Sequence, residues 1–233
     1  MNPPRHFQDE LDELKSRVVA LAGRAEEAVR LAVEALLGRD RSKAERAIRM
    51  DREIDQLELD IDDFAIQLLA LQQPMARDLR LITTALSITT DLERIGDHAV
   101  NIAEAVEYML GAAPLPPLPE IEEMVRTANR MLGDALDAFV RGDAALARDV
   151  LRRDDRVDEL HQNVFRILLT HMMEDPRRIS TGMDLYIVSG NLERIADLAT
   201  NIAEEVVFLV EGRTIKHQAE ERRTGEAAPE QGR

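Results

Sequence analysis

Apolar residues recur every three to four positions along most of the chain, a spacing that predicts α-helices. Glycine and proline interrupt this pattern at only a few places and divide the chain into long segments. The first half contains three such segments and the second half three more. The predicted helices cover about Arg5–Leu37, Ser42–Leu71, Met75–Leu110, Pro119–Val140, Asp143–Met172 and Arg177–Val210. The pattern therefore predicts an all-α fold of six long helices.

The third and the sixth segments have the most regular apolar spacing. Apolar residues step by four and three positions from Leu81 to Met109, and again from Val188 to Leu209. This spacing is typical of the buried face of a helix in a bundle. Each half of the chain is therefore expected to fold as a three-helix bundle.

The two halves also repeat each other in sequence. Asp91–Val106 and Asn191–Val206 share 11 of 16 residues at an offset of 100, and Asp51–Leu57 resembles Asp154–Leu160 at an offset of 103. We therefore expect two tandem three-helix bundles, related by this repeat, over residues 1–110 and 120–212. Residues 111–119 are rich in proline and form a predicted linker, and the polar residues 213–233 form a predicted disordered tail.

Charge and composition exclude several classes of function. The chain has 30 Lys and Arg residues against 45 Asp and Glu, a formal net charge of -15 that would repel nucleic acids and anionic lipids. It has no cysteine, which excludes disulfides, thiolate metal sites and a cysteine nucleophile. No uncharged stretch is long enough to span a bilayer, and the N-terminus lacks the apolar region of a signal peptide. We therefore expect a cytoplasmic protein that neither binds nucleic acid nor inserts into a membrane.

Four pairs of acidic residues are the main candidate for chemistry, because the members of each pair lie four positions apart on one helix face. Two carboxylates at this spacing repel each other, whereas a shared cation would hold them together, and Mg²⁺, Mn²⁺ and iron accept such oxygen ligands. The helical period places these residues away from the apolar stripe, so a metal would sit at the surface between two helices of one bundle. The candidate ligands are Asp51, Asp55, Glu93 and Asp97 in the first repeat and Asp154, Asp158, Glu193 and Asp197 in the second. The alternative is a solvated outer face, with Arg94 and Arg194 pairing with the aspartates three positions later.

Several other polar residues lie near these pairs in the sequence. Asn101 and Asn201 extend the acidic stripe by one turn and could either ligate a cation or bond to water or a neighbouring helix. His98 corresponds to Leu198 in the second repeat, so a metal role common to both repeats is not expected. His161 follows an acidic pair by three positions and could be a ligand in the second repeat only.

Two stretches of sequence identify a family resemblance. LALQQPMARDLRLI followed by DLERIGDHAVNIAE, and EDPRRI followed by NLERIADLATNIAE, resemble the PhoU family in both halves of the chain. The resemblance implies a negative regulator of the phosphate-starvation response, which links the ATPase subunit of the phosphate ABC transporter to a sensor histidine kinase. It also implies surface metals, iron or zinc in some members, at the eight acidic positions. The second repeat has Ala196 and Leu198 where the first has Gly96 and His98, so equal metal occupancy of the two sites is not expected.

The resulting interpretation is a homodimeric regulatory adaptor that is not an enzyme. A carboxylate-bridged dimetal enzyme is one alternative, but it would need inward-facing Glu-x-x-His pairs, and the nearest approach is Asp158-x-x-His161. A purely structural oligomerisation module is the other alternative. No glycine-rich phosphate-binding loop is present, so we expect no direct binding of free phosphate.

Overall fold

The structure, a computed structural model, describes residues 5–72, 74–112 and 115–215, and these residues are almost entirely helical and contain no strand. This confirms the predicted all-α class. None of the helices within these ranges has a stretch apolar and long enough to cross a membrane. The elements are α1 (Arg5–Gly38), α2 (Arg41–Gln72), α3 (Arg77–Met109), α4 (Pro119–Arg141), α5 (Ala144–Leu151), α6 (Asp154–Glu174), the short 3₁₀ helix η1 (Pro176–Arg178) and α7 (Ile179–Glu211). Most of the predicted tail, residues 216–233, lies outside the described residues.

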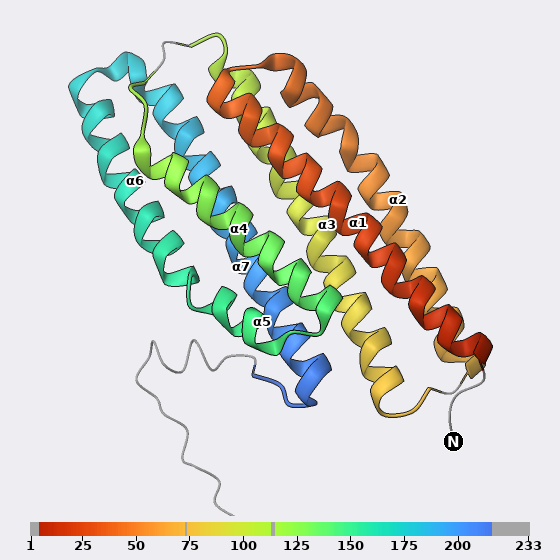
Figure 1. The fold of residues 1–233 in the computed structure, drawn as a ribbon. Helices are drawn as coiled ribbons and strands as arrows, with labels where there is room; N and C mark the ends of the chain where they lie inside the picture. Colours follow the sequence, from red (N-terminus) through yellow and green to blue (C-terminus); the bar gives the residue numbers. More distant parts are fainter. Residues whose placement is uncertain (1–4, 73, 113–114, 216–233) are drawn as a thin grey trace, which may run out of the picture.

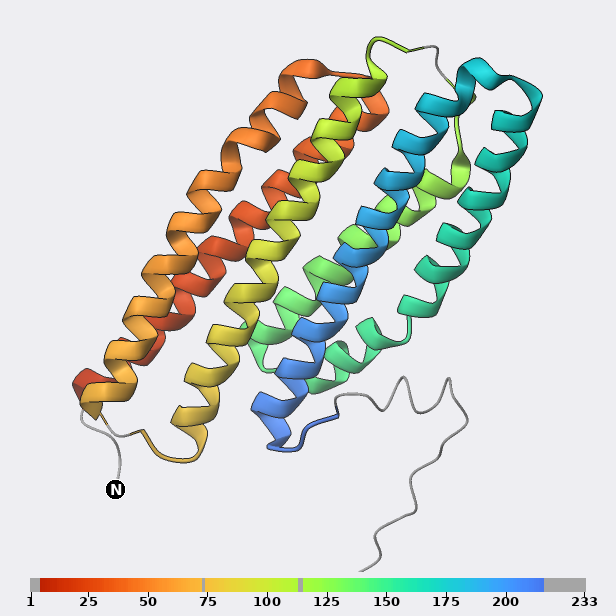
Figure 2. The same cartoon turned by 180° about the vertical axis from the view of Figure 1, so that it is seen from behind.

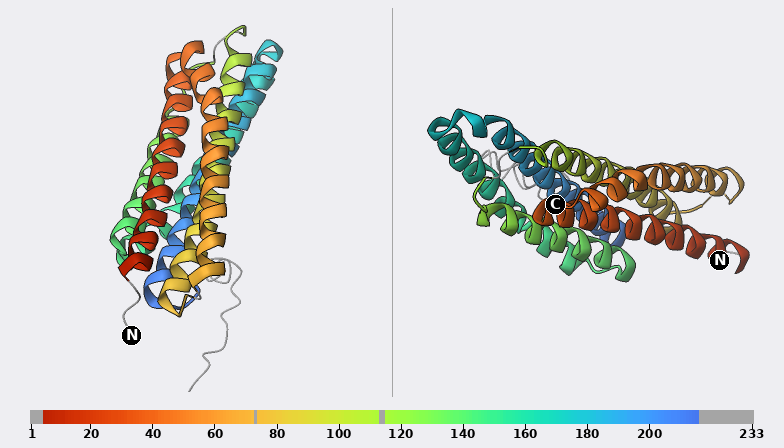
Figure 3. Two further views of the ribbon diagram at one scale, coloured as in Figure 1. Left: turned by 90° about the vertical axis from the view of Figure 1, so that its right-hand side faces the viewer. Right: turned by 90° about the horizontal axis from the view of Figure 1, so that it is seen from above.

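The helices form two bundles that lie side by side, as the repeat predicts. Helices α1, α2 and α3 pack together in the first bundle, and α4, α5, α6 and α7 in the second. The bundles meet chiefly along α3 and α7, which run antiparallel through the middle of the molecule (Figures 1 and 2). Figure 3 shows that the helix axes give the molecule an elongated shape. Each repeat therefore contributes its last helix to the seam between the bundles.

The predicted apolar stripes form the core. The regularly spaced apolar residues of α3, from Leu81 to Met109, are all buried, and those of α7 are buried from Val188 to Val206 and half-buried at Leu209. Leu71, the apolar residue at the end of the second predicted helix, does not join the core, because it is 77% exposed. Leu71 is the second-last residue of α2, where the chain turns away before α3 begins.

The largest difference from the prediction is a break in the fifth helix. One continuous helix was expected there, but α5 ends at Leu151 and α6 begins at Asp154. At the offset of 103, Arg153 takes the place of Met50, which is buried in the unbroken α2. The Arg153 guanidinium instead donates to the carboxylates of Asp134 and Asp149. The helix thus breaks where a paired guanidinium stands in place of a buried apolar side chain.

The first repeat has a close approach of α2 and α3 at Gly96 that the second repeat lacks at the corresponding position. A Cβ atom at Gly96 in α3 would lie 2.9 Å from Cδ1 and 3.2 Å from Cγ2 of Ile54 in α2. At the corresponding positions the second repeat has Ala196 and Val157, both fully buried. Compared with the first repeat, the second thus has one more side-chain carbon on α7 (Ala196 for Gly96) and one fewer on α6 (Val157 for Ile54). The glycine lets α2 carry the larger side chain.

Candidate functional site

The four predicted carboxylates of the first repeat lie where α2 packs against α3. Asp51 and Asp55 belong to α2, and Glu93 and Asp97 belong to α3. Burial raises the pKa of Asp51, and the negative charges of Asp55 and Asp97 raise it further. Carboxylates from both helices thus act on one another, so the two pairs form a single acidic cluster.

Glu93 shows most clearly that burial and negative charge outweigh the nearby positive charge in this cluster. Burial, together with the charges of Asp97 and Glu58, raises the pKa of Glu93 to about 7, while Arg94 opposes the rise. Glu58 belongs to the cluster as well, since burial and neighbouring carboxylates, Asp55 among them, raise its pKa. The sequence analysis missed Glu58, although it follows Asp55 by three positions and so shares its helix face. Such a cluster favours a bound proton or cation.

The second repeat brings three of its predicted residues into closer contact. One carboxylate oxygen from each of Asp154, Asp158 and Asp197 lies within 4.8 Å of the other two. Asp154 and Asp158 sit in the first turns of α6, and Asp197 reaches them from α7. Within the described ranges, no other group of three or more acidic or histidine side chains meets this distance. We refer to these three residues as the aspartate triad.

Glu193, the fourth predicted residue of the second repeat, lies beside the triad without joining it. Burial raises the pKa of Glu193, Asp158 and Asp154 add to the rise, and Arg194 opposes it. Glu193 is half-buried, whereas Asp197 is exposed at the surface. The structure therefore separates residues that the sequence pattern treats as equivalent.

The donor set of the aspartate triad fits a hard divalent cation. All three groups offer carboxylate oxygens, the ligands preferred by Mg²⁺ and Mn²⁺ and accepted by iron. Asp154 and Asp158 are partly exposed and Asp197 is exposed, so water could complete the coordination of an ion. In the first repeat the predicted residues do not reach the same mutual distance, and side chains would have to rotate to share one ion.

The neighbouring polar residues join helices across the seam between the bundles. Asn191 Oδ1 lies 2.9 Å from His98 Nδ1 and accepts a hydrogen bond from Asn101 Nδ2 at 3.3 Å. Of the two roles considered for Asn101, the structure shows the hydrogen bond to a neighbouring helix. His161 lies outside the triad, with Nδ1 3.0 Å from Ser189 Oγ. The sequence analysis missed Asn191 because its partners lie about 90 residues away along the chain.

Comparison with known proteins adds family evidence to this geometry. The family model described as the PhoU domain matches residues 18–106 and residues 121–206. The two matches fall on the two bundles, and together they cover most of the described chain.

Individual proteins match the chain over nearly its whole length. It is 39% identical to the phosphate-specific transport system accessory protein PhoU homolog of Pseudomonas putida, over 95% of this chain and 87% of that one. The Aquifex aeolicus homolog of the same name is 42% identical, over 90% and 95% of the two chains. Two crystal structures share the fold. PhoU from Pseudomonas aeruginosa has a TM-score of 0.85 at 39% identity and covers 89% of this chain and 100% of its own. The phosphate transport system regulatory protein PhoU from Streptococcus pneumoniae has a TM-score of 0.84 at 31% identity, covering 90% and 99%.

Proposed function

The chain belongs to the PhoU family, and we propose on that basis that it is a regulatory accessory protein of phosphate transport. The observation that carries the proposal is the match of both bundles to the PhoU domain, together with relatives that are named as accessory proteins of the phosphate-specific transport system. The description of these relatives as accessory proteins of a transport system supports a role that is not enzymatic.

The specific role we propose is that of an adaptor. The protein would bind the ATPase subunit of the phosphate ABC transporter and a sensor histidine kinase, and it would keep the kinase from activating the starvation response when phosphate is plentiful. It would act in the cytoplasm as a homodimer. The long helices and the net charge of -15 give it extended acidic surfaces, which suit protein partners with basic patches.

The adaptor role is tested by direct binding. The purified ATPase subunit and the cytoplasmic part of the kinase from the same organism are immobilised, and binding of the full chain is measured at high and at low phosphate. An unrelated helical protein of similar net charge is the control. Binding of both partners, stronger than that of the control, is the expected result. If neither partner binds at any phosphate level, the adaptor role is wrong.

We further propose that the aspartate triad holds a divalent metal ion, with iron, zinc, manganese and magnesium as the candidate ions. Asp154, Asp158 and Asp197 would supply oxygen ligands, and Glu193 would lie next to the ion. The ion would cancel the mutual repulsion of these groups and fix α6 against α7. The acidic cluster of the first repeat, with Asp51, Asp55, Glu93 and Asp97, would be a weaker second site, because its carboxylates lie farther apart.

Elemental analysis tests the metal proposal. The protein is purified without chelator, both as wild type and as a variant with all three triad aspartates changed to asparagine. The control variant carries the same charge change at Asp60, Asp63 and Asp137, which are not in the triad. Stoichiometric metal in the wild type and the control, but not in the triad variant, is expected. Metal absent from all three after repletion would show that the triad is a solvated surface.

The dimetal enzyme remains the competing function and has its own test. Multiple-turnover ferroxidase and phosphatase assays are run on metal-loaded protein. Rapid turnover that disappears in Glu93→Ala would favour the enzyme over the adaptor.

A further inference from the structure

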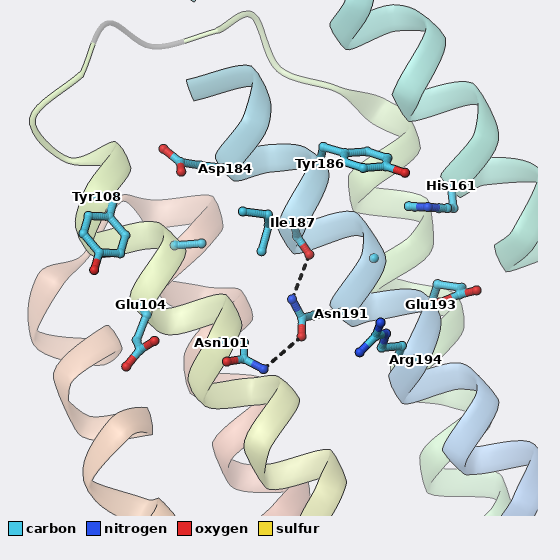
Figure 4. A pocket seen from close by; sticks show the side chains of 12 residues that line it. Asn101, Glu104, Tyr108, His161, Asp184, Tyr186, Ile187, Asn191, Glu193 and Arg194 are labelled. Carbon is cyan, nitrogen blue, oxygen red and sulfur yellow. Dashed lines mark hydrogen bonds between the residues drawn. The ribbon is translucent and has the colours of Figure 1, made fainter. Parts of the chain in front are cut away.

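A hollow of about 600 Å³ lies where α3, α6 and α7 meet; no triad aspartate lines it, but Glu193, which neighbours the triad, does. Figure 4 shows Asn101, Glu104 and Tyr108 along α3, opposite Asp184 and Ile187 on α7. Three carboxylates line the hollow, those of Glu104, Asp184 and Glu193, against a single arginine. The hollow is therefore acidic, and it opens to solvent beside exposed side chains.

Asp184 has a buried carboxylate oxygen that lacks a hydrogen-bond partner. Its Oδ2 atom is buried without a donor among the described residues, and burial raises the pKa of the group. The repeat shows what is missing. At the position related to Asp184, Thr84 donates to Glu205 Oε2 at 3.5 Å across the seam. The residue related to Glu205 is Ala105, whose short side chain lines the hollow. One half of the seam is thus closed by a polar pair, whereas the other is open beside a carboxylate without a donor.

Aromatic rings complete the chemistry of the hollow. Tyr108 stands at one wall with 76% of its surface exposed. Tyr186 forms the opposite wall, where it stacks on His161 with ring centroids 5.2 Å apart. Carboxylates combined with aromatic faces are the groups that hold an ammonium or guanidinium.

An apolar surface continues from the hollow along α6 and α7. Phe165 contacts Tyr186, with ring centroids 5.4 Å apart, and Leu169 follows Phe165 by one turn. Leu169, Met183 and Ile187 are all between 43% and 47% exposed. The first repeat instead carries Asp62, Ile66, Thr83 and Ser87 at the positions of Phe165, Leu169, Met183 and Ile187. Ile66 is the one apolar counterpart and is 58% exposed, so the apolar side chains at the other three positions belong to the second repeat alone.

We propose that the hollow and this apolar surface together, here called the Asp184 groove, bind a basic amphipathic helix of a partner protein. An arginine or lysine of that helix enters the hollow between Tyr108 and Asp184, and its apolar face covers Phe165 and Ile187. The inference rests on the proposed adaptor function, which requires a protein partner. At this groove a second copy of the chain, with its own net charge of -15, would be repelled by the carboxylates, so the proposed homodimer would form through another surface; an anionic lipid surface would be repelled in the same way.

Peptide binding tests the groove directly. The probe is a fluorescein-labelled synthetic helix with leucines at helical spacing on one face and arginines on the other, and its control has citrulline in place of every arginine. Anisotropy is measured at physiological salt with wild type, Asp184→Asn and Tyr108→Ala. Two matched control variants lie away from the groove: Asp63→Asn makes the same charge change, and Leu71→Ala shortens an exposed apolar side chain. Circular dichroism confirms that each variant is folded.

The arginine peptide is expected to bind wild type and to lose about tenfold or more in affinity to each groove variant but not to the controls. Equal binding of the citrulline peptide, or equal loss in Asp63→Asn, would show non-specific attraction and overturn the proposal. Sedimentation of wild type and Ile187→Glu tests the other occupant, because a dimer lost in Ile187→Glu would mean that a second copy covers the groove.

The same variants separate this inference from the adaptor function. If the transporter ATPase and the kinase bind both groove variants as tightly as wild type, the proposal that the groove binds a partner is wrong, whereas the proposed adaptor function is supported. If neither partner binds the wild type, the adaptor fails, and the peptide measurement still decides whether the groove binds a basic helix.

Discussion

The packing of Gly96 against Ile54 predicts a compensating pair of substitutions. In Gly96→Ala the new methyl group meets Ile54 at 2.9 and 3.2 Å, closer than carbon atoms pack. Overpacking of this kind costs about 1–3 kcal/mol, whereas alanine in place of glycine inside a helix contributes about 1 kcal/mol of stability. The net expectation is a loss of up to about 2 kcal/mol from the free energy of unfolding.

The second substitution, Ile54→Val, removes Cδ1, the closer of the two carbons that the new methyl group meets, and leaves Cγ2 at 3.2 Å. Ile54→Val alone leaves space in the core and should cost about 0.5–1.5 kcal/mol. In the double variant the alanine methyl occupies that space, as the second repeat arranges it with Ala196 and Val157. The double variant should therefore unfold with a free energy within about 1 kcal/mol of wild type, a favourable coupling of about 1–2 kcal/mol.

Urea unfolding followed by circular dichroism at 222 nm measures this coupling across the four proteins. Gly133→Ala is the matched control, because a Cβ atom there meets only Glu26 Oε1, at an ordinary 3.5 Å. It should stabilise α4 and show no coupling to Ile54→Val. If Gly96→Ala stabilised the protein as much as Gly133→Ala, or if the coupling were zero, the steric argument would be refuted.

Three further predictions concern pH, the seam and the helix break. Because the pKa of Glu93 is raised from 4.5 to about 7 in the folded protein, its stabilising contribution is present at low pH and is lost as pH rises through 7. Melting temperatures from pH 4 to 8 should therefore fall less in Glu93→Gln than in wild type or the exposed control Glu53→Gln, and parallel curves would contradict this. Asn191→Ala removes the acceptor shared by two α3 side chains and should lower the free energy of unfolding by about 1–3 kcal/mol, as measured with urea. A loss below about 0.5 kcal/mol, on the order of experimental error, would show that these hydrogen bonds do not stabilise the seam. The amides of Arg152 and Arg153 bond to carbonyls three residues back and should exchange with solvent faster than amides in the middle of α2, so equal protection would argue for an unbroken helix in solution.

The local pattern of the chain was enough to predict most of the fold. Helical period and the few glycines and prolines located the helices to within a few residues, and the repeat predicted the two bundles. The break at Arg153 escaped prediction because no glycine or proline marks it. Only alignment with Met50 shows that a charged residue has entered an apolar stripe.

The sequence could point to the acidic residues of the candidate site but not to their geometry. Spacing identified the acidic pairs, because residues four apart share a helix face. It could not show that Asp154, Asp158 and Asp197 approach more closely than their counterparts, since that depends on how α6 sits on α7. The Asp184 groove could not be predicted either, because it is formed by side chains from three helices that only tertiary packing brings together.

The antiparallel seam of α3 and α7 means that the peptide between the two bundles does not hold them together. The halves are joined by side chains along two long helices and by contacts of α1 with α4, while only the segment between Met109 and Pro119 connects them covalently. Two separately synthesised fragments, divided within that segment, should therefore bind each other and rebuild the whole molecule. Their association would be weaker only because the tether no longer provides a high effective concentration of one half near the other. The two fragments could then serve as a split reporter, in which the extent of reassembly measures the strength of the contacts between α3 and α7.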